Sequence, residues 1–152
     1  PGGAGFASHQ DAPAYPFIAT HVTCLITIDD MTTDNGALRF AFGNPVGLLE
    51  QNELGCVAEH EVKRLRWTNS LIPKNSCVFF SSYVPHFSEA NHSELPRRAI
   101  YVTYNRKSDG NLREKYYSER NKRLDAAKAV NMPQISLISD FQGQIIDAPG
   151  GG

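Results

Sequence analysis

The sequence predicts a mainly β fold, a sandwich or barrel of short strands followed by one helix. Short apolar or β-branched runs recur through the first 105 residues, and Gly, Pro and Asn-Gly turn signals separate them. After residue 110 the pattern changes to a helical period. Short strands broken by turns at this spacing are typical of all-β sandwiches and barrels, and the jelly roll is one of these architectures.

The first two clear strands flank a tight turn. "HVTCLITID" (21–29) alternates and is rich in β-branched residues, which favours a strand. Asn35 and Gly36 then give a turn signal, and "ALRFAF" (37–42) follows as the next strand. A loop punctuated by Gly and Pro comes after it.

Three further strands are expected in the next part of the chain. The segment "HEVKRLRW" (60–67) alternates again and predicts a strand. The segment "SCVFFSSYVPH" (76–86) is a nearly continuous apolar run, as expected for a strand buried on both sides. The segment "RAIYVTYN" (98–105) is the last strand of the series.

A helix is expected over 111–130, because Asn111 and Glu114 match a capping box and no Pro or Gly interrupts the segment. We therefore expect a single domain over 1–152 with a β-barrel core over 1–105. A motif that carries chemistry already occurs nine residues into the chain, where a barrel would normally have built a supporting strand. The N-terminal part of the fold is accordingly expected to be missing.

Composition excludes several classes of function. The chain has 152 residues, 41% hydrophobic and 20% charged, which is ordinary for a soluble globular domain. Its net charge of −1, without a basic stripe, argues against a nucleic-acid partner, because phosphate neutralisation needs clustered Lys and Arg. No apolar run approaches the roughly 20 residues that span a bilayer, so no membrane partner is expected. The oligomeric state has no signal in the sequence.

The three cysteines do not form a recognisable framework. Cys24, Cys56 and Cys77 are widely spaced and odd in number, which excludes a disulfide scaffold or a CxxC zinc site. Cys24 and Cys77 lie in apolar strand-like runs, so we expect them to be small buried side chains. A reducing, cytoplasmic location follows, unless a missing N-terminal segment carries a targeting signal.

A short motif near the start of the chain is the first candidate for chemistry. In "GFASHQDAPAY", His9 and Asp11 are two residues apart, so in a strand both side chains point to one face, about 6–7 Å apart. Two protein ligands hold most metals poorly, and a third ligand is therefore needed.

Four other histidines are candidates for that third ligand. His60 lies in a charged alternating segment and is expected to be exposed, and His92 lies in a loop rich in Ser, Glu and Pro. His21 opens a strand and is expected to be a satisfied core or rim histidine. His86 ends the most buried strand, which places an imidazole at the rim of a barrel.

Together, His9, Asp11 and His86 match the two-histidine, one-carboxylate facial triad of non-haem Fe(II). Such a triad leaves three coordination positions open for a bidentate cosubstrate and O₂. An anionic cosubstrate also needs a cation at its far end. Arg97, at the start of the next strand, provides a guanidinium for this purpose, and Ser88 provides a hydroxyl donor.

The two-residue period of a strand extends the candidate site. If Arg97 faces the interior, Ala99, Tyr101 and Thr103 face it too, and Tyr101 and Thr103 then line the floor of the pocket. Arg98, taken by itself, is expected to be a surface charge beside a turn. His86 is likewise expected to share a face with Ser82 and Phe80.

Several segments resemble one known family. The segments "HQDAPAY", "DNGAL", "VFFSSYVPHFSEANHSELPRRAIYVTYN" and "DGNLREKYYSER" resemble the phytanoyl-CoA dioxygenase superfamily of Fe(II)/2-oxoglutarate oxygenases. Within it, the chain is most similar to the branch labelled 2-aminoethylphosphonate dioxygenase. The resemblance implies a double-stranded β-helix of the jelly-roll or cupin-like type.

The resemblance also implies roles for particular residues. It implies Fe(II) held by His9, Asp11 and His86, and 2-oxoglutarate anchored by Arg97 with help from Ser88. Asn91 is expected to order its loop. Asp11 stands where halogenating relatives have a small residue, so hydroxylation is favoured over halogenation.

The implied reaction couples oxidative decarboxylation of 2-oxoglutarate by O₂ to hydroxylation of a substrate C–H bond. The substrate is then a small polar molecule, and the branch resemblance points to 2-aminoethylphosphonate. Tyr15, Tyr101 and Arg98 are the expected substrate-binding residues, although Tyr15 can equally pack over the iron.

Two other functions are compatible with the same residues. One is an inactive or truncated β-helix that serves as a binding module. The other is a zinc-dependent hydrolase that uses the same triad with an open fourth position, and it does not require Arg97 or 2-oxoglutarate.

Overall fold

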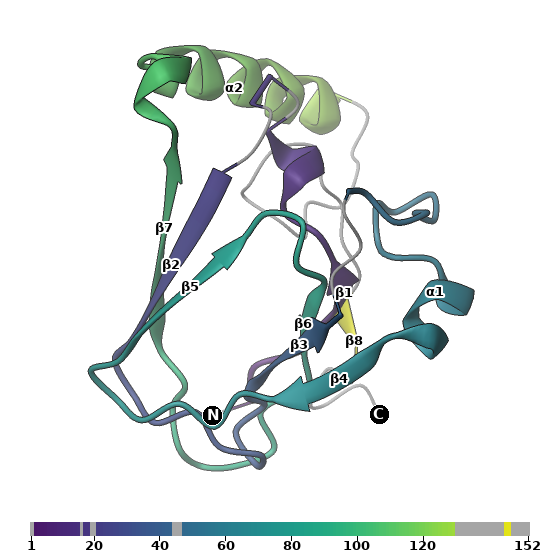
Figure 1. The fold of residues 1–152 in the computed structure, drawn as a ribbon, viewed down its shortest axis with the longest axis vertical. Coiled ribbons are helices and arrows are strands. Elements are labelled where there is room, and N and C mark those ends of the chain that lie inside the picture. Colours follow the sequence, from purple (N-terminus) through teal and green to yellow (C-terminus); the bar gives the residue numbers. More distant parts are fainter. Residues whose placement is uncertain (1, 16, 19–20, 44–46, 130–144, 147–152) are drawn as a thin grey trace.

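Two antiparallel sheets face each other, and the long helix lies across one end of them (Figure 1). The structure is a computed structural model that describes residues 2–15, 17–18, 21–43, 47–129 and 145–146. The larger sheet has the order β4-β3-β6-β1-β8, with bounds Arg66–Asn69, Leu38–Phe42, His86–Ser88, Gly5–His9 and Ile145–Ile146. The smaller sheet has the order β5-β2-β7, with bounds Cys77–Ser81, His21–Thr27 and Ala99–Asn105.

The described helices lie outside the sheets. They are α1 (Glu59–Arg64), α2 (Arg113–Ala129) and the short 3₁₀ segments η1 (Ala12–Ala14) and η2 (Lys107–Asp109). The α2 helix falls within the predicted range 111–130, of which residue 130 lies outside the described residues. Asn111 accepts a hydrogen bond from the backbone N–H of Arg113, the first residue of α2, whereas the predicted capping box requires one from the backbone N–H of Glu114. Neither α1 nor α2 has the length and apolar character needed to cross a bilayer.

The hydrophobic core lies between the two sheets. Leu25 and Phe80 from the smaller sheet pack against Leu38 and Phe40 from the larger one, and Met31 closes the cluster. Inward and outward residues alternate along much of β2, as the period of a strand requires. The strands predicted over 21–29, 37–42 and 98–105 are confirmed as β2, β3 and β7, and so is the mainly β class.

The strand predicted over 60–67 was wrong. Glu59–Arg64 forms α1, and β4 begins only at Arg66. Acidic residues in the first turn and basic residues in the last favour a helix, and Glu59 forms an ion pair with Lys63 at 2.6 Å, one helical turn away. Alternation of charged and apolar side chains in so short a segment does not separate a strand from a surface helix.

The single strand predicted over 76–86 was also wrong. The chain leaves β5 after Ser81, turns with a hydrogen bond from Val84 N–H to the Ser81 carbonyl, and enters the other sheet as β6 at His86. The β5 strand is not buried on both sides, because Phe79 is 67% exposed. His86 therefore begins a strand and does not end one, and its side chain is buried.

All three cysteines are free thiols. Cys24 is buried, as predicted, whereas Cys77 is exposed. The expectation for Cys77 was wrong because β5 has an outer face that no described element covers.

The turn at Asn35 and Gly36 joins distant parts of the fold. The Asn35 side chain is buried and accepts a hydrogen bond from Thr32 N–H at 2.8 Å, while its amide donates to the Asp30 carbonyl at 2.7 Å. Gly36 has φ +75°, and a Cβ there would collide with the carbonyl oxygens of Glu89 and Ala90.

Replacing Gly36 with alanine should lower the free energy of unfolding by about 2–4 kcal/mol, because the left-handed backbone and the backbone collision both oppose a Cβ. Gly43 is the matched control, since it also has a positive φ but no described atom within 4 Å of the place where a Cβ would lie. Gly43→Ala should lower the free energy of unfolding by roughly 1 kcal/mol. Urea unfolding of both variants measures the difference, and equal losses would contradict the collision.

Candidate metal centre and cosubstrate pocket

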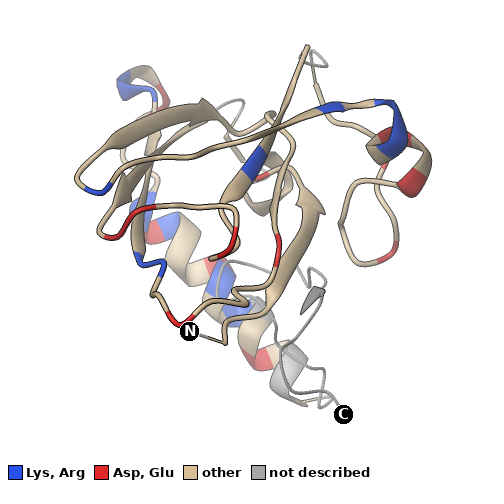
Figure 2. Cartoon of the chain, turned by 90° about the horizontal axis from the view of Figure 1, so that it is seen from below, with Lys and Arg blue, Asp and Glu red and all other residues tan. Residues whose placement is uncertain are grey.

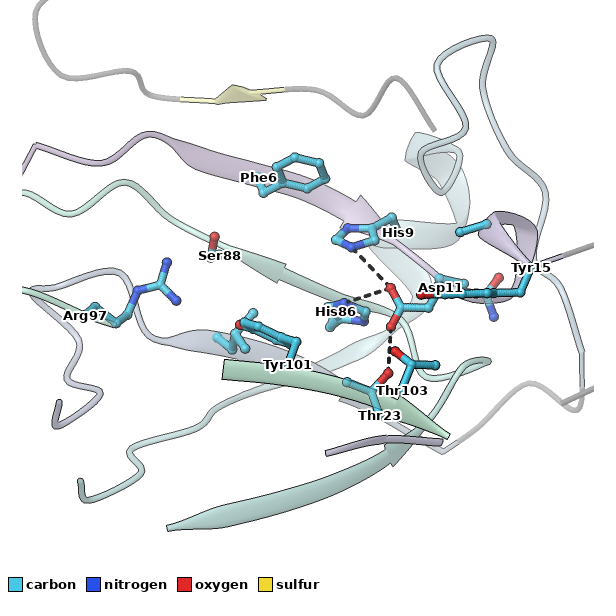
Figure 3. A pocket seen from close by; sticks show the side chains of 13 residues that line it. Phe6, His9, Asp11, Tyr15, Thr23, His86, Ser88, Arg97, Tyr101 and Thr103 are labelled. Carbon is cyan, nitrogen blue, oxygen red and sulfur yellow. Dashed lines mark hydrogen bonds and ion pairs between the residues drawn. The ribbon is translucent and has the colours of Figure 1, made fainter. Parts of the chain in front are cut away.

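Three ligand-type side chains meet where the two sheets approach each other. His9 ends β1, His86 begins β6 beside it, and Asp11 lies two residues after the end of β1. The Nε2 atoms of His9 and His86 lie 3.8 and 3.6 Å from Asp11 Oδ1. One ligand atom from each of the three residues lies within 4.8 Å of the other two, so all three can reach one ion (Figure 3).

Both imidazoles are held in the tautomer that a metal needs. His9 Nδ1 is 2.8 Å from the Ala7 carbonyl oxygen, and His86 Nδ1 is 2.9 Å from the Val84 carbonyl oxygen. A carbonyl oxygen only accepts hydrogen bonds, so each Nδ1 carries the proton and donates it. Each Nε2 therefore presents its lone pair, and the outer hydrogen bond fixes the ring plane.

The protonation state of His9 also suits a metal ligand. Burial and the neighbouring His86 lower the pKa of His9 to about 3, although Asp11 opposes this shift. His9 is therefore a neutral imidazole at neutral pH. The short distance between His9 Nε2 and Asp11 Oδ1 therefore brings two potential metal ligands together and is not an ion pair.

Asp11 is oriented from the opposite sheet. The Thr23 hydroxyl, on the inner face of β2, donates to Asp11 Oδ2 at 3.2 Å and leaves Oδ1 facing the imidazoles. Thr23 was not among the residues predicted from the sequence. The strand period could have indicated Thr23, because residues two apart in a strand share a face and Thr23 therefore lies on the same face of β2 as His21.

Replacing Thr23 with valine should lower the affinity for Fe(II) by about 10-fold or more, because the variant keeps the shape but loses the hydroxyl that orients Asp11. Competition with a chelator measures this affinity. Thr68→Val, on the exposed part of β4, is the control and should leave it unchanged. Equal affinities in the folded Thr23 variant would show that Asp11 needs no such partner.

The residue between the two N-terminal ligands anchors neighbouring loops. Gln10 is buried, and its amide donates to the Tyr83 carbonyl at 2.7 Å and to the Gly47 carbonyl at 3.0 Å. Its side-chain oxygen accepts a hydrogen bond from Leu49 N–H at 2.8 Å. The sequence held no signal for this role, because all three contacts are distant along the chain.

A cavity of about 250 Å³ opens beside the triad and contains most of the predicted site. Its wall includes the five residues Tyr15, Ser88, Arg97, Tyr101 and Thr103, and Figure 3 shows Arg97 at the end farthest from Asp11. The parity prediction for β7 is thereby confirmed, since Arg97, Tyr101 and Thr103 all face the cavity.

Arg97 is held in place without being neutralised. Its Nε–H donates to the Asn35 carbonyl at 3.1 Å, and Tyr101 lines the same cavity. Desolvation in the pocket raises the pKa of Tyr101, while Arg97 opposes that rise. Among the described residues, no carboxylate lies within ion-pair distance of Arg97, so its charge can pair with an anionic ligand.

Two of the named residues lie outside this cavity. The Arg98 guanidinium forms a bidentate pair with Asp29, at 2.8 and 2.9 Å, and lowers the pKa of that carboxyl to about 2. The structure therefore does not place Arg98 on the wall of this cavity, and its side chain is the surface charge that the sequence indicated. Asn91 accepts from Ser93 N–H and donates to the Leu95 carbonyl, which orders the loop as expected.

The remaining histidines do not join the triad. His60 and His92 are exposed, which agrees with their polar, charged surroundings in the sequence. His21 is buried, but neither of its ring nitrogens has a hydrogen-bond partner among the described residues, so the expectation of a satisfied histidine was wrong. Its ring packs edge-on against Tyr15, at 4.3 Å between centroids.

The donor set fits Fe(II). Two imidazoles and one carboxyl group point ligand atoms at one place, and one side of the group faces an open cavity with an unneutralised guanidinium. A family model described as Phytanoyl-CoA dioxygenase (PhyH) matches residues 1–99. The chain belongs to the phytanoyl-CoA dioxygenase family.

Two curated relatives of this phytanoyl-CoA dioxygenase family member act on phosphonates by name. The chain is 40% identical over 148 residues to a methylphosphonate hydroxylase of Gimesia maris, covering 95% of the chain and 56% of the relative. It is 41% identical over 127 residues to a 2-aminoethylphosphonate dioxygenase of an uncultured bacterium, and this match covers 82% of the chain and 48% of the relative. The chain thus spans about half the length of these curated relatives.

Solved structures with the same fold are more distant in sequence. EctD from S. alaskensis matches 70% of the chain and 41% of its own, with a TM-score of 0.58 and 17% identity. A second match is the non-heme alpha ketoglutarate dependent carbocyclase SnoK from nogalamycin biosynthesis. The match covers 73% of this chain and 50% of SnoK, with a TM-score of 0.56 and 20% identity. These likenesses confirm the predicted double-stranded β-helix, or jelly-roll, fold.

Proposed function

We propose that the protein is an Fe(II)- and 2-oxoglutarate-dependent dioxygenase that hydroxylates a C–H bond of a small phosphonate. The observation that carries this proposal is the placement of the triad and Arg97 at opposite ends of one cavity. A zinc hydrolase needs the triad but has no use for a fixed, unneutralised guanidinium at that position.

The cofactor and cosubstrate supply the oxidising chemistry: with O₂, Fe(II) and 2-oxoglutarate yield succinate, CO₂ and one oxygen atom for the substrate C–H bond. The chain supplies binding and orientation. His9, Asp11 and His86 hold the metal through the ligand atoms that converge beside the cavity. Arg97, fixed by the Asn35 carbonyl, pairs with the far carboxylate of the cosubstrate, and Ser88 adds a hydroxyl on the same wall.

The phosphonate part of the proposal rests on the two curated relatives, whose names specify methylphosphonate and 2-aminoethylphosphonate. The cavity supports it through hydroxyl groups that donate to an anion, those of Tyr15, Tyr101 and Thr103. Among the described residues, Asp11 is the only carboxylate on the wall, and a bound Fe(II) compensates its charge.

Succinate release by the full-length protein, supplied with Fe(II), 2-oxoglutarate and O₂, tests this function. We expect methylphosphonate or 2-aminoethylphosphonate to stimulate release severalfold, and inorganic phosphate, which has no C–H bond, to give no stimulation. Succinate formed at one rate with and without both phosphonates would refute the substrate. The absence of any iron-dependent succinate would refute the oxygenase.

A further inference from the structure

A second cavity adjoins the metal pocket on the side of α2. It has a volume of about 610 Å³ and shares Tyr15, Tyr101 and Thr103 with the metal pocket. Its remaining wall comes mainly from the start of α2, the loop before it and the end of β7. A molecule that reaches the triad from this side passes the shared residues.

The charge on this wall has one sign. Arg113 and Arg120 line the cavity, and no Asp or Glu of the described part of the chain does. Helix α2 itself carries both signs along its length, as Figure 2 shows, with Glu114 and Glu119 among its acids. Of the charged side chains of α2 that the structure describes, only basic ones therefore line the cavity.

Arg113 is the better placed of the two cations. Its guanidinium lies over the Tyr117 ring, 4.8 Å from the centroid, a contact that does not neutralise its charge. Within the described ranges of the chain, no carboxylate lies within ion-pair distance of Arg113. The side chain is exposed at the cavity and keeps its full charge for a ligand.

Phenols complete the wall between the two cavities. Tyr15 and Tyr116 stack with centroids 4.9 Å apart and planes at 22°. Burial and the neighbouring Tyr15 raise the pKa of Tyr116. The Tyr116 phenol therefore stays protonated, and the pair can donate to an anion.

We propose that this second cavity is the anion subsite for the phosphonate substrate, with Arg113 as its charged contact and the phenols of Tyr15 and Tyr116 as neutral donors. The phosphonate is first held on the α2 side, and it then passes Tyr15, Tyr101 and Thr103 to bring its C–H bond to the triad. That the bound anion is the substrate rests on the proposed function, whereas the anion subsite is defined by the cavity and its charges.

Equilibrium binding to the full-length protein, without iron or O₂, tests the subsite by calorimetry. The probes are methylphosphonate, 2-aminoethylphosphonate and inorganic phosphate. Arg113→Glu should weaken phosphonate binding at least about tenfold, because it removes a charge-assisted contact and adds repulsion. Arg113→Lys should retain part of the affinity. The matched control is Lys122→Glu, the same charge change at an exposed residue of α2 outside the cavity.

Three results would overturn the subsite: no phosphonate binding by the wild type, equal binding by Arg113→Glu, or an equal loss in Lys122→Glu. Inorganic phosphate that binds as tightly as both phosphonates would show a general phosphate site, and this too would overturn the assignment to substrate. Failure of the proposed function is a separate outcome, since it appears as missing succinate while Arg113-dependent phosphonate binding persists.

Discussion

Asp11→Ala should abolish Fe(II) binding and succinate formation. Asp11 is the only acidic member of the triad, and its Oδ1 is the atom that both imidazoles face. Two imidazoles remain in the variant, which is too few ligands to hold the ion. We expect the affinity to fall by more than about 100-fold, beyond the 10–100-fold that loss of an outer hydrogen-bond partner costs.

An Fe(II) titration read alongside succinate release measures this effect. Asp29→Ala is the control, because Asp29 pairs with Arg98 outside the cavity and its loss should leave metal binding unchanged. The variant should stay folded, since Asp11 is partly exposed and makes its side-chain contacts within the site. Full activity of Asp11→Ala would show that the metal is bound elsewhere.

Arg97→Gln should weaken 2-oxoglutarate binding by about 100-fold while Fe(II) affinity is unchanged, because removing one partner of a desolvated charge pair costs several kcal/mol. The effect is confined to the cosubstrate because Arg97 lies at the end of the cavity away from Asp11. The Michaelis constant for 2-oxoglutarate and direct binding of the cosubstrate to the metal-loaded protein both measure it.

The neighbouring arginine provides the matched control for that variant. Arg98→Gln removes the same charge one residue away, but from a side chain that pairs with Asp29 at the surface. It should leave cosubstrate binding unchanged. Equal effects of the two substitutions would mean that general charge, and not the position of Arg97, attracts 2-oxoglutarate.

The parts of the site that depend on strand parity could be predicted from the sequence. Arg97, Tyr101 and Thr103 lie an even number of residues apart, and the structure places all three on the cavity wall. His9 and Asp11 were close in the chain, and His86 was chosen as the third ligand because it was expected to end the most buried strand. That choice brought His86 into the cluster although the strand containing it was assigned wrongly.

The rest depended on contacts that no local pattern reports. The break after Ser81, where the chain moves from one sheet to the other, lies inside a nearly continuous apolar run, so hydrophobicity alone predicted one strand. Thr23 meets Asp11 only because the two sheets face each other. Arg113 and Tyr116 reach the site because α2 folds across the end of the sheets, and no spacing in the helix specifies that packing.

The origin of the new oxygen atom tests the central claim most directly. The full-length protein, given Fe(II), 2-oxoglutarate, ¹⁸O₂ and the phosphonate that stimulates succinate release, should form hydroxylated phosphonate and succinate in equal amounts. Both products should carry one ¹⁸O atom, as read by mass spectrometry. A product that takes its oxygen from H₂¹⁸O, formed without succinate and supported by zinc, would contradict the dioxygenase and favour the hydrolase.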